Sequence, residues 1–377
     1  MSLSSRSPIE PMPQTCPSPD ADPSPRVDSR ALRRTGLHPD YWHPLARSTD
    51  LGPGKALGVS FAGEPIVLVR PVKGEVFALE DRCAHRQVPL HLGQVRGDRV
   101  QCGYHCWTYD RTGRCVNVPY LGPGETLPSG VRNYPAREAY GLIFVFPGDP
   151  ARAGTVPFPD IPTYGKPAYK TRFLDRRIHC HYSFMHENLM DMNHQFLHRS
   201  LMGTIRATLL EVREGTDWVE ADYTFSRAAG KQPWGERFMI NRKHEPDAAK
   251  GLIDLMTIRT GYPYQTLQFR TAGSTEPALD LWNSYVPVDR LQCVNQTYGL
   301  MMIRKPALPG MIHLIWPFIV LFTNGIFRQD RDIVEAEQHA FDEQGEDLNN
   351  EISPVICKLK VLLTRKGLPL PRSSQQP

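Results

Sequence analysis

Two short segments of the sequence each pair one cysteine with one histidine. The first reads Cys83-Ala-His85 and the second reads Cys102-Gly-Tyr-His105. Two thiolates and two imidazoles are the donors that a [2Fe–2S] cluster needs when two His replace two Cys on one of its irons. A structural zinc ion takes the same donors, but zinc fingers usually keep the two Cys together and the two His together. The mixed order therefore favours an iron–sulfur cluster bound by Cys83, His85, Cys102 and His105.

The residues around these four donors also follow a known pattern. The stretch CAHRQVPLHLG, followed by CGYHCWTYDRTG, closely resembles the Rieske domain of ring-hydroxylating oxygenases. Respiratory-chain Rieske proteins join their two loops by a disulfide, whereas the corresponding positions here are Val88 and Tyr104. The resemblance therefore implies the low-potential centre of oxygenases and ferredoxins. Cys106 stands where the oxygenases usually have Gly, and we expect it to be a small buried residue that does not bind the cluster.

A second set of metal-binding residue types lies further along the chain. Residues 184–198 contain neither Gly nor Pro and are rich in Met, Leu and Phe, so they predict a helix. On that helix Glu187, Asp191, His194 and His198 recur at spacings of four, three and four, which places them on one face. Two His at i and i+4, completed by a carboxylate, suit the facial triad of mononuclear non-haem Fe(II). For a single His, a core position would be the simpler explanation.

Beside the first motif, the run Asn188-x-x-Asp191-x-x-His194-x-x-x-His198 is similar to the catalytic signature of the same oxygenase family. The resemblance implies that His194 and His198 bind the iron and that Asn188 and Asp191 have catalytic roles. Many members have one more residue between the two His, so His186 and His181 are the alternatives to His198.

In this family the third iron ligand is an Asp shortly before a helical Glu. Asp330 aligns best with that position, five residues ahead of Glu335, and Asp332 is the second candidate. Capping of a helix N-terminus is the explanation without a metal, because Asp suits that position.

Asp191 has a separate role by resemblance. In the family the corresponding carboxylate bridges a cluster His of one subunit to an iron-ligating His of its neighbour, and such a bridge fixes both rings. The resemblance implies a path from His105 or His85 of one subunit through Asp191 to His194 of the next. A head-to-tail contact that closes gives a ring-shaped homotrimer.

The whole chain divides into four segments. Residues 1–40, rich in Pro and Ser, predict a disordered tail. Residues 41–150 contain short apolar runs between turn residues, which predict an all-β Rieske [2Fe–2S] domain. Residues 151–367 predict an antiparallel sheet with helices, matching the helix-grip-like catalytic domain of the family, and residues 368–377 predict a second disordered tail. The predicted fold class is therefore α+β.

Three further stretches carry weaker predictions. The polar span from Ala228 to Gly251 predicts a long hairpin connection or a lid. Residues 306–327 are the most apolar and predict a channel wall or core rather than peripheral membrane docking, which is not expected. The last helix is expected from Asp330 to Lys366. Six residues or strands are candidates for a substrate pocket and equally for ordinary core: Met185, Met190, Met192, Phe196, Met202 and the strand of Trp282.

The composition excludes some classes of function and leaves one main candidate. A net charge of +4 over 377 residues does not indicate nucleic-acid binding. Of the eight cysteines, the six other than Cys83 and Cys102 show no paired spacing, and no signal peptide is recognisable; both observations favour the cytoplasm. The resemblance implies the oxygenase component of a Rieske system, which uses O2 at a mononuclear Fe(II) to hydroxylate, dealkylate or dihydroxylate an aromatic or otherwise apolar organic substrate.

The electrons for this reaction would come from NAD(P)H. The sequence has no Gly-rich dinucleotide fingerprint after a strand, so we expect a separate reductase, with or without a ferredoxin. The competing interpretation is a Rieske electron-transfer protein whose second domain only docks to partners. The polar stripe at Asp191, His194 and His198 argues against it, because an electron carrier needs no second metal. The substrate and the choice between mono- and dioxygenation stay open at this stage.

Overall fold

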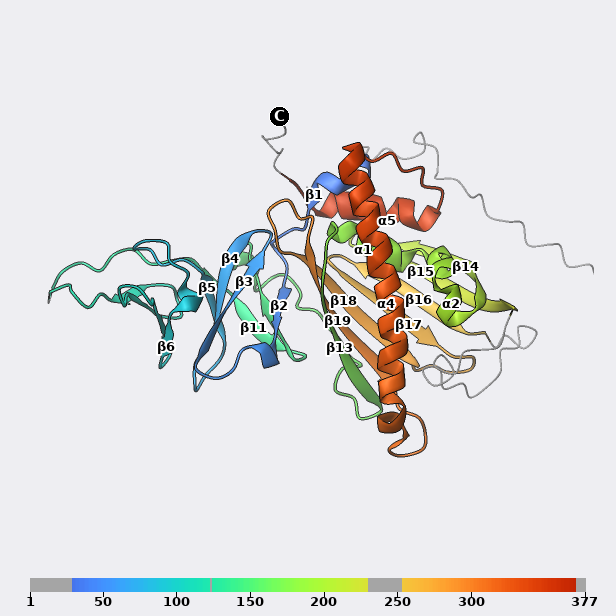
Figure 1. The fold of residues 1–377 in the computed structure, drawn as a ribbon, viewed down its shortest axis with the longest axis horizontal. Helices are drawn as coiled ribbons and strands as arrows, with labels where there is room; N and C mark the ends of the chain where they lie inside the picture. The colour runs from blue at the N-terminus through green and yellow to red at the C-terminus, as the bar shows by residue number, and fades with distance from the viewer. Residues whose placement is uncertain (1–28, 123, 230–252, 371–377) are drawn as a thin grey trace, which may run out of the picture.

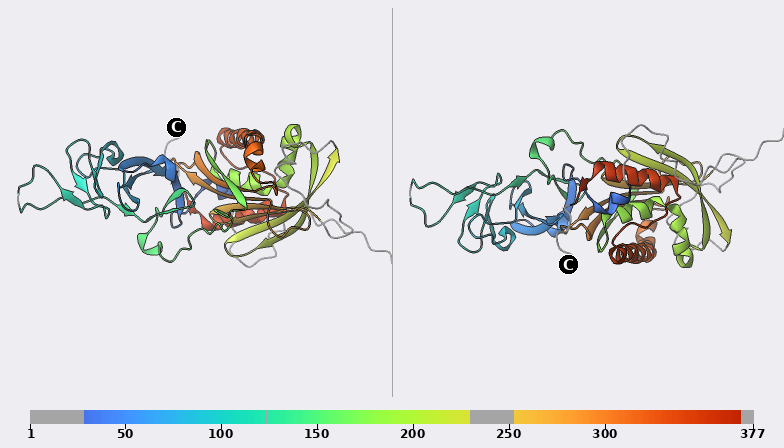
Figure 2. Two further views of the ribbon diagram at one scale, coloured as in Figure 1. Left: turned by 90° about the horizontal axis from the view of Figure 1, so that it is seen from below. Right: turned by 90° about the horizontal axis from the view of Figure 1, so that it is seen from above.

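The computed structural model describes residues 29–122, 124–229 and 253–370. Figure 1 shows a smaller region of short strands beside a larger region in which helices cover one broad sheet. The smaller region extends away from one side of the helix-covered sheet in both views of Figure 2.

The smaller region consists of three antiparallel sheets, with strand orders β10-β5-β4-β3, β11-β12-β2 and β6-β7-β8-β9. The strands are β2 (His43–Arg47), β3 (Lys55–Phe61), β4 (Glu64–Arg70), β5 (Phe77–Glu80), β6 (Gln94–Arg96), β7 (Arg99–Gln101), β8 (Thr108–Tyr109), β9 (Cys115–Asn117), β10 (Asn133–Tyr134), β11 (Ala136–Ala139) and β12 (Leu142–Val145). Short 3-10 turns are η2 (Ser48–Asp50), η3 (Leu90–Leu92) and η4 (Pro150–Arg152). The prediction of an all-β domain is confirmed.

Strand β4 explains how this region holds its loops rigidly. Its apolar run is buried on both faces because successive side chains of a strand point to opposite sides. Ile66 and Leu68 belong to the large core of the molecule, whereas Val67 and Val69 belong to a separate small core beneath the cysteine–histidine loops. The loops are therefore packed on a sheet that is itself anchored in the body of the protein.

The larger region is built on one seven-stranded antiparallel sheet with the order β13-β19-β18-β17-β16-β15-β14. Its strands are β13 (Tyr169–Ile178), β14 (Thr204–Glu214), β15 (Trp218–Ala229), β16 (Leu255–Gly261), β17 (Tyr264–Arg270), β18 (Leu279–Pro287) and β19 (Asn295–Arg304). The helices are α1 (Tyr182–Met190), η5 (Met192–His198), α2 (Arg199–Met202), α4 (Met311–Gln344) and α5 (Pro354–Lys366). The predicted α+β fold, with an antiparallel sheet and helices in the second domain, is confirmed.

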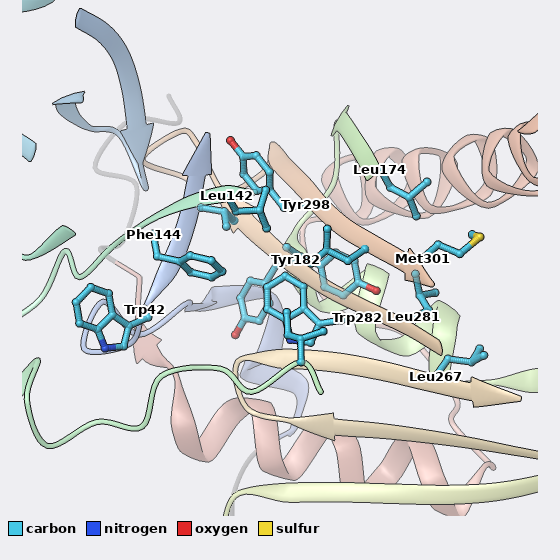
Figure 3. Packing of buried hydrophobic residues seen from close by; sticks show 14 of the residues in the cluster. Trp42, Leu142, Phe144, Leu174, Tyr182, Leu267, Leu281, Trp282, Tyr298 and Met301 are labelled. Carbon is cyan, nitrogen blue, oxygen red and sulfur yellow. The ribbon is translucent and has the colours of Figure 1, made fainter. Parts of the chain in front are cut away.

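The two regions share one hydrophobic core. Aromatic side chains of the smaller region lie next to those of the large sheet (Figure 3), and the rings of Phe144 and Trp282 are 6.1 Å apart. Tyr298 donates a hydrogen bond of 2.6 Å to the carbonyl of Leu45 across the same boundary. Because aromatic rings from both regions are buried against each other, the smaller region is fixed against the sheet.

The predicted continuous helix over residues 184–198 is wrong. Helix α1 ends at Met190, and Asp191 adopts an extended conformation with φ −89° and ψ 94°. The Asp191 side chain accepts the N–H of Asn193 and caps the following 3-10 helix η5. The Tyr223 hydroxyl donates a hydrogen bond of 2.9 Å to the Met190 carbonyl, which would otherwise have no partner at the end of the helix.

The predicted disordered tails are wrong where the structure describes them. Residues Ser29–Arg34 form the 3-10 helix η1, and β1 (Thr35–Gly36) pairs with β20 (Leu368–Pro369). Leu32 is fully buried, and Arg33 makes a bidentate ion pair with Glu187 at 2.6 and 3.1 Å. The polar composition of this segment gave no sign that Leu32 and Arg33 pack against the larger region. Residues 1–28 and 371–377 lie outside the described part of the chain.

The predicted last helix also differs from the structure. Helix α4 begins at Met311 and runs unbroken through Pro317, and α5 is a separate helix that starts at Pro354. Ile312, Ile315 and Ile319 pack into the core, while Leu314 and Leu321 of the same half are exposed. By length and composition alone α4 could cross a membrane, a test that core helices of soluble proteins also pass. The predicted lid lies outside the described residues from position 230 onward.

Candidate functional site

The two cysteine–histidine loops have the same backbone turn. In the first, the N–H of Cys83 bonds the carbonyl of Val88 and the N–H of Gln87 bonds the carbonyl of Cys83, at 2.8 and 2.9 Å. In the second, Cys102 bonds Trp107 and Cys106 bonds Cys102 in the same way, at 2.8 and 3.2 Å. Each turn closes on a residue with positive φ, 61° at Gln87 and 58° at Cys106. A conformation that favours glycine explains why related loops have Gly at the second position.

The loops lie close together because one glycine permits it. A Cβ atom on Gly93 would stand 2.0 Å from the carbonyl oxygen of Gln101, a clash that no side chain can relieve. The rings of His85 and His105 consequently approach to 4.5 Å in an edge-to-face arrangement. The thiols of Cys83 and Cys102 are buried beside them. The four predicted donors are therefore brought to one place.

These donors fit a [2Fe–2S] cluster. The Nδ1 atoms of both His85 and His105 are buried and lack any hydrogen-bond partner among the described residues. Unpartnered buried nitrogens are costly unless something binds them, and a metal does so. The indole of Trp107 stacks on His85 at 4.8 Å and fixes its ring plane.

Tyr109 also belongs to this site and was not singled out as a functional residue from the sequence. Its hydroxyl accepts the N–H of Ala84 at 3.0 Å and lies 3.2 Å from the sulfur of Cys83. Burial raises the pKa of Tyr109, so the phenol stays protonated and donates toward that sulfur. Hydrogen bonds to cluster sulfurs tune the reduction potential. Cys106, which we expected to be buried, is exposed.

The second group of predicted residues meets between η5 and α4. The ligand atoms of His194, His198 and Asp330 lie within 4.8 Å of one another. An oxygen of Asp330 is 3.7 Å from Nε2 of His194 and 3.3 Å from Nε2 of His198. Two imidazoles and one carboxylate in this arrangement are the donor set of a facial triad.

Neighbouring groups orient each of these three side chains. Nδ1 of His194 contacts the carbonyl oxygen of Asp191, and Nδ1 of His198 is 2.9 Å from the side-chain oxygen of Gln329. Both contacts leave Nε2 facing the triad, as metal-ligating imidazoles require. Asn188 donates to Asp330 at 3.2 Å. Burial disfavours the charged form of His198, but Asp330 and Gln329 together outweigh burial and raise the pKa of that imidazole.

The break at Asp191 changes the predicted polar stripe. Glu187 points away from the triad to Arg33 and, at 3.6 Å, to the ammonium of Lys360. Asp191 contributes its carbonyl toward the triad, and its carboxylate accepts two bonds from Asn193, both at 2.9 Å.

The alternatives to the triad lie elsewhere. His181 caps α1, and its other ring nitrogen is 3.1 Å from the carbonyl of Thr35. His186 packs edge-on against Tyr285 at 4.8 Å. Burial lowers the pKa of each of these two histidines to about 3. Asp332 is exposed and pairs with Arg331.

Helix capping does not account for Asp330. This residue lies in the middle of α4, far from the N-terminus of that helix at Met311. Its position is instead set by packing of α4 over the sheet, which brings it to η5.

A cavity lies directly beside the triad. Its apolar wall comes from Leu174, Ile178, Met185, Leu189, Leu281 and Phe327. Its polar lining comes from Arg176, Asn188, Asn283, Tyr285, Thr297, Asp330 and Arg331. Of the predicted pocket residues only Met185 lines it, and Trp282 faces the core of the smaller region instead (Figure 3). Alternate residues of a strand point to the same side, so the sequence of β18 could have identified Leu281, Asn283 and Tyr285 as one face of the sheet.

Comparison with protein families matches both regions. Residues 41–135 match the Rieske [2Fe-2S] domain, and residues 178–356 match the vanillate O-demethylase oxygenase C-terminal domain. The two matches cover both metal-binding segments in the expected order. The chain belongs to the Rieske non-haem iron oxygenases, as an oxygenase subunit of that family.

Individual relatives agree with this assignment. The chain is 39% identical over 199 residues to 4beta-methylsterol monooxygenase of Methylococcus capsulatus, which is 52% of this chain and 54% of the relative. It is 36% identical over 160 residues, 42% of this chain and 47% of the relative, to the oxygenase component of dicamba O-demethylase from Stenotrophomonas maltophilia. The matched segment thus spans about half the length of these curated relatives.

A solved structure shares the fold over most of the chain. The crystal structure of dicamba monooxygenase bound to dicamba superimposes with a TM-score of 0.70, covering 88% of this chain and 98% of that one at 21% identity. At this identity the likeness supports the architecture of both regions.

Proposed function

We propose that this chain is the catalytic oxygenase component of a Rieske system acting on an apolar organic substrate. Cys83, His85, Cys102 and His105 hold the [2Fe–2S] cluster. His194, His198 and Asp330 hold a mononuclear Fe(II). The convergence of the last three on one point beside a cavity carries this proposal, because an electron-transfer protein has no use for a second metal. When bound, the cluster supplies single electrons and the mononuclear iron activates O2.

The residues around the triad have separate tasks in this proposal. The carbonyl of Asp191 and the amide of Gln329 fix the ring planes of His194 and His198. Asn188 donates to Asp330 and keeps one of its oxygens in place. The side chains of Leu189 and Phe327 keep water away from the place where substrate binds.

The electron inlet of the triad is a neighbouring copy of the chain. Figure 1 shows the cluster loops, next to β6, at one end of the molecule and the elements α1 and α4 in the other region. The Asp191 side chain is partly exposed, so a histidine of another subunit can approach it. A head-to-tail contact between cluster loops and Asp191 closes into a homotrimer.

The remaining partners follow from the same scheme. His85 and His105 are only half-buried and Tyr104 is 57% exposed, so the cluster end of the molecule is accessible to an electron donor. That donor is a separate NAD(P)H-dependent reductase, with or without a ferredoxin, and the location is the cytoplasm. The catalytic unit includes residues 29–40, because η1 packs on α5 and Arg33 on α1.

Iron analysis of anaerobically purified protein tests the proposal. About three iron atoms per chain are expected, from a two-iron cluster and one mononuclear site. About two irons would instead support the electron-transfer protein with a docking domain. A substrate screen by mass spectrometry with 18O2 and a surrogate reductase then identifies the product and tells one incorporated oxygen atom from two.

A further inference from the structure

The cavity beside the triad contains one hydrogen-bond acceptor that the protein leaves unused. Asn283 lies on β18 in the middle of the sheet, is 6% exposed and lines the cavity together with Asp330. Its side-chain oxygen receives no hydrogen bond from any described residue. A buried amide oxygen normally has a donor, so an unused one in a ligand cavity indicates a bond that the ligand completes.

The orientation of this amide is fixed by a chain of hydrogen bonds that starts at Gln265. The amide nitrogen of Gln265 donates to the carbonyl of His186 at 2.9 Å and to the hydroxyl of Thr260 at 3.0 Å. The amide oxygen of Gln265 must therefore face the hydroxyl of Tyr285, which donates its only proton to it at 2.9 Å.

The next bond in the chain decides which end of Asn283 faces the cavity. Because the Tyr285 proton is committed, the phenolic oxygen can only accept, and the Asn283 amide nitrogen donates to it at 3.3 Å. Rotating the amide by a half-turn would place two acceptors against each other. The nitrogen of Asn283 thus stays at Tyr285 and its oxygen stays available.

The neighbouring strand leaves room for that oxygen. Gly299 pairs with Asn283 across β18 and β19. A Cβ atom on Gly299 would stand 2.5 Å from the Asn283 oxygen and 3.0 Å from Leu174. Any other residue at position 299 would crowd the acceptor against the apolar wall.

Thr297 is a further neutral polar residue on the sheet wall, and its hydroxyl oxygen can also only accept a hydrogen bond from a ligand. The hydroxyl of Thr297 donates its proton to the side-chain oxygen of Asn295 at 3.0 Å, so it too can only accept from a ligand. The two guanidinium groups at the cavity differ: Arg331 pairs with Asp332, whereas Arg176 donates one hydrogen bond to the side-chain oxygen of Asn324. Among the described residues, the side-chain oxygens of Asn283 and Thr297 on the sheet wall can therefore only accept a hydrogen bond from the ligand.

We propose that Asn283 selects the substrate: an uncharged apolar molecule that carries a hydrogen-bond donor, such as a phenolic or alcoholic hydroxyl group. The hydroxyl donates to the Asn283 oxygen while the hydrocarbon part packs on Leu281 and Phe327. A carboxylate at this place would bring negative charge against an acceptor oxygen. This inference rests on the proposed function, because it assigns the substrate class of the same cavity.

Three ligands of one shape test the assignment: 4-tert-butylphenol, its methyl ether 4-tert-butylanisole, and 4-tert-butylbenzoate. Each is titrated by calorimetry into the reduced, iron-loaded protein without O2. The phenol is expected to bind at least about tenfold more tightly than the ether, because the ether leaves the buried oxygen unpaired. The benzoate is expected to bind more weakly than the phenol.

Two variants on neighbouring positions of β18 locate the effect. Asn283→Leu keeps the size of the side chain and removes the acceptor, so the phenol should lose its advantage over the ether. Ser284→Ala is the matched control, because adjacent strand residues face opposite sides of the sheet, and it should keep the wild-type ratio. Equal binding of phenol and ether to the wild type, or a phenol preference that survives in Asn283→Leu, overturns the assignment.

The remaining outcomes also decide the matter. Tightest binding by the benzoate, lost in Arg176→Leu, would assign an anionic substrate held by Arg176 instead. No binding of the phenol at millimolar concentration would also overturn the assignment. Iron content is measured on the same samples: about three irons without a phenol preference removes this inference alone, whereas about two irons removes the proposed function.

Discussion

The cluster loops take their four donors from two backbone turns of the same form, whereas the triad takes three donors from two segments that are far apart in the sequence. In the loops each Cys lies two or three residues from its His, and the turn itself sets their geometry. In the triad His194 and His198 come from a short 3-10 helix, and Asp330 comes from the middle of α4. One centre is therefore determined locally and the other by packing.

Exposure differs in the same way. His85 and His105 are half-buried, which leaves them within reach of an electron donor. The side chain of His198 is 5% exposed and that of Asp330 is 13% exposed, next to an apolar cavity. An electron entry point has to be accessible, while a site for O2 chemistry has to exclude water. The following variants test this contrast, from the largest expected effect to the smallest.

Removal of the carboxylate from the triad should eliminate one centre and leave the other. In Asp330→Ala we expect about two irons per chain, an unchanged visible spectrum of the cluster and no O2-dependent product. Asp332→Ala is the matched control, because its side chain is 58% exposed and its partner is Arg331. Iron analysis and absorption spectra check both proteins. An Asp330→Ala protein that keeps its third iron would contradict the ligand assignment.

The N-terminal segment should stabilise the region of the triad through one buried ion pair. In Arg33→Met the Glu187 carboxylate loses its bidentate partner, and we expect the free energy of unfolding to fall by about 3–5 kcal/mol. Arg34→Met is the control, since Arg34 makes one exposed bond to the carbonyl of Gly345 and should change stability by less than about 0.5 kcal/mol. Denaturant unfolding measures both. Equal midpoints for the two variants would show that the segment adds no stability.

The charge of Asp191 should matter for communication between the centres rather than for their assembly. In Asp191→Asn we expect both metals to remain and substrate-coupled reoxidation of the reduced cluster to slow by about 10–100-fold. Asn still caps η5, whereas Asp191→Ala also loses the cap and about 1 kcal/mol of stability. Stopped-flow spectroscopy follows the cluster in both. A wild-type rate in Asp191→Asn would remove the bridging role.

The smallest effect is expected in the cluster loops themselves. Cys106→Gly relieves a positive φ of 58° at an exposed side chain, and we expect a stability gain of up to about 1 kcal/mol with an unchanged cluster spectrum. Gln87→Gly, at the equivalent position of the first loop, should behave alike. Loss of the cluster in Cys106→Gly would mean that this thiol is a ligand after all.

The sequence by itself determined the cluster motif and the two-domain α+β fold. Spacings of two and three residues within one turn leave little geometric freedom, so Cys83, His85, Cys102 and His105 could be predicted as cluster donors without a structure. The small all-β domain and the antiparallel sheet followed from alternating apolar runs, which depend on local strand geometry.

Only the tertiary structure decided the features that join distant segments. The helix break at Asp191 depends on Tyr223, the order of residues 29–40 depends on Glu187, and the choice of Asp330 over Asp332 depends on how α4 packs. The free acceptor of Asn283 follows from bonds that begin at Gln265 and His186. Such contacts are set by packing between elements far apart in the chain, and the local secondary-structure propensity of the residues cannot predict them.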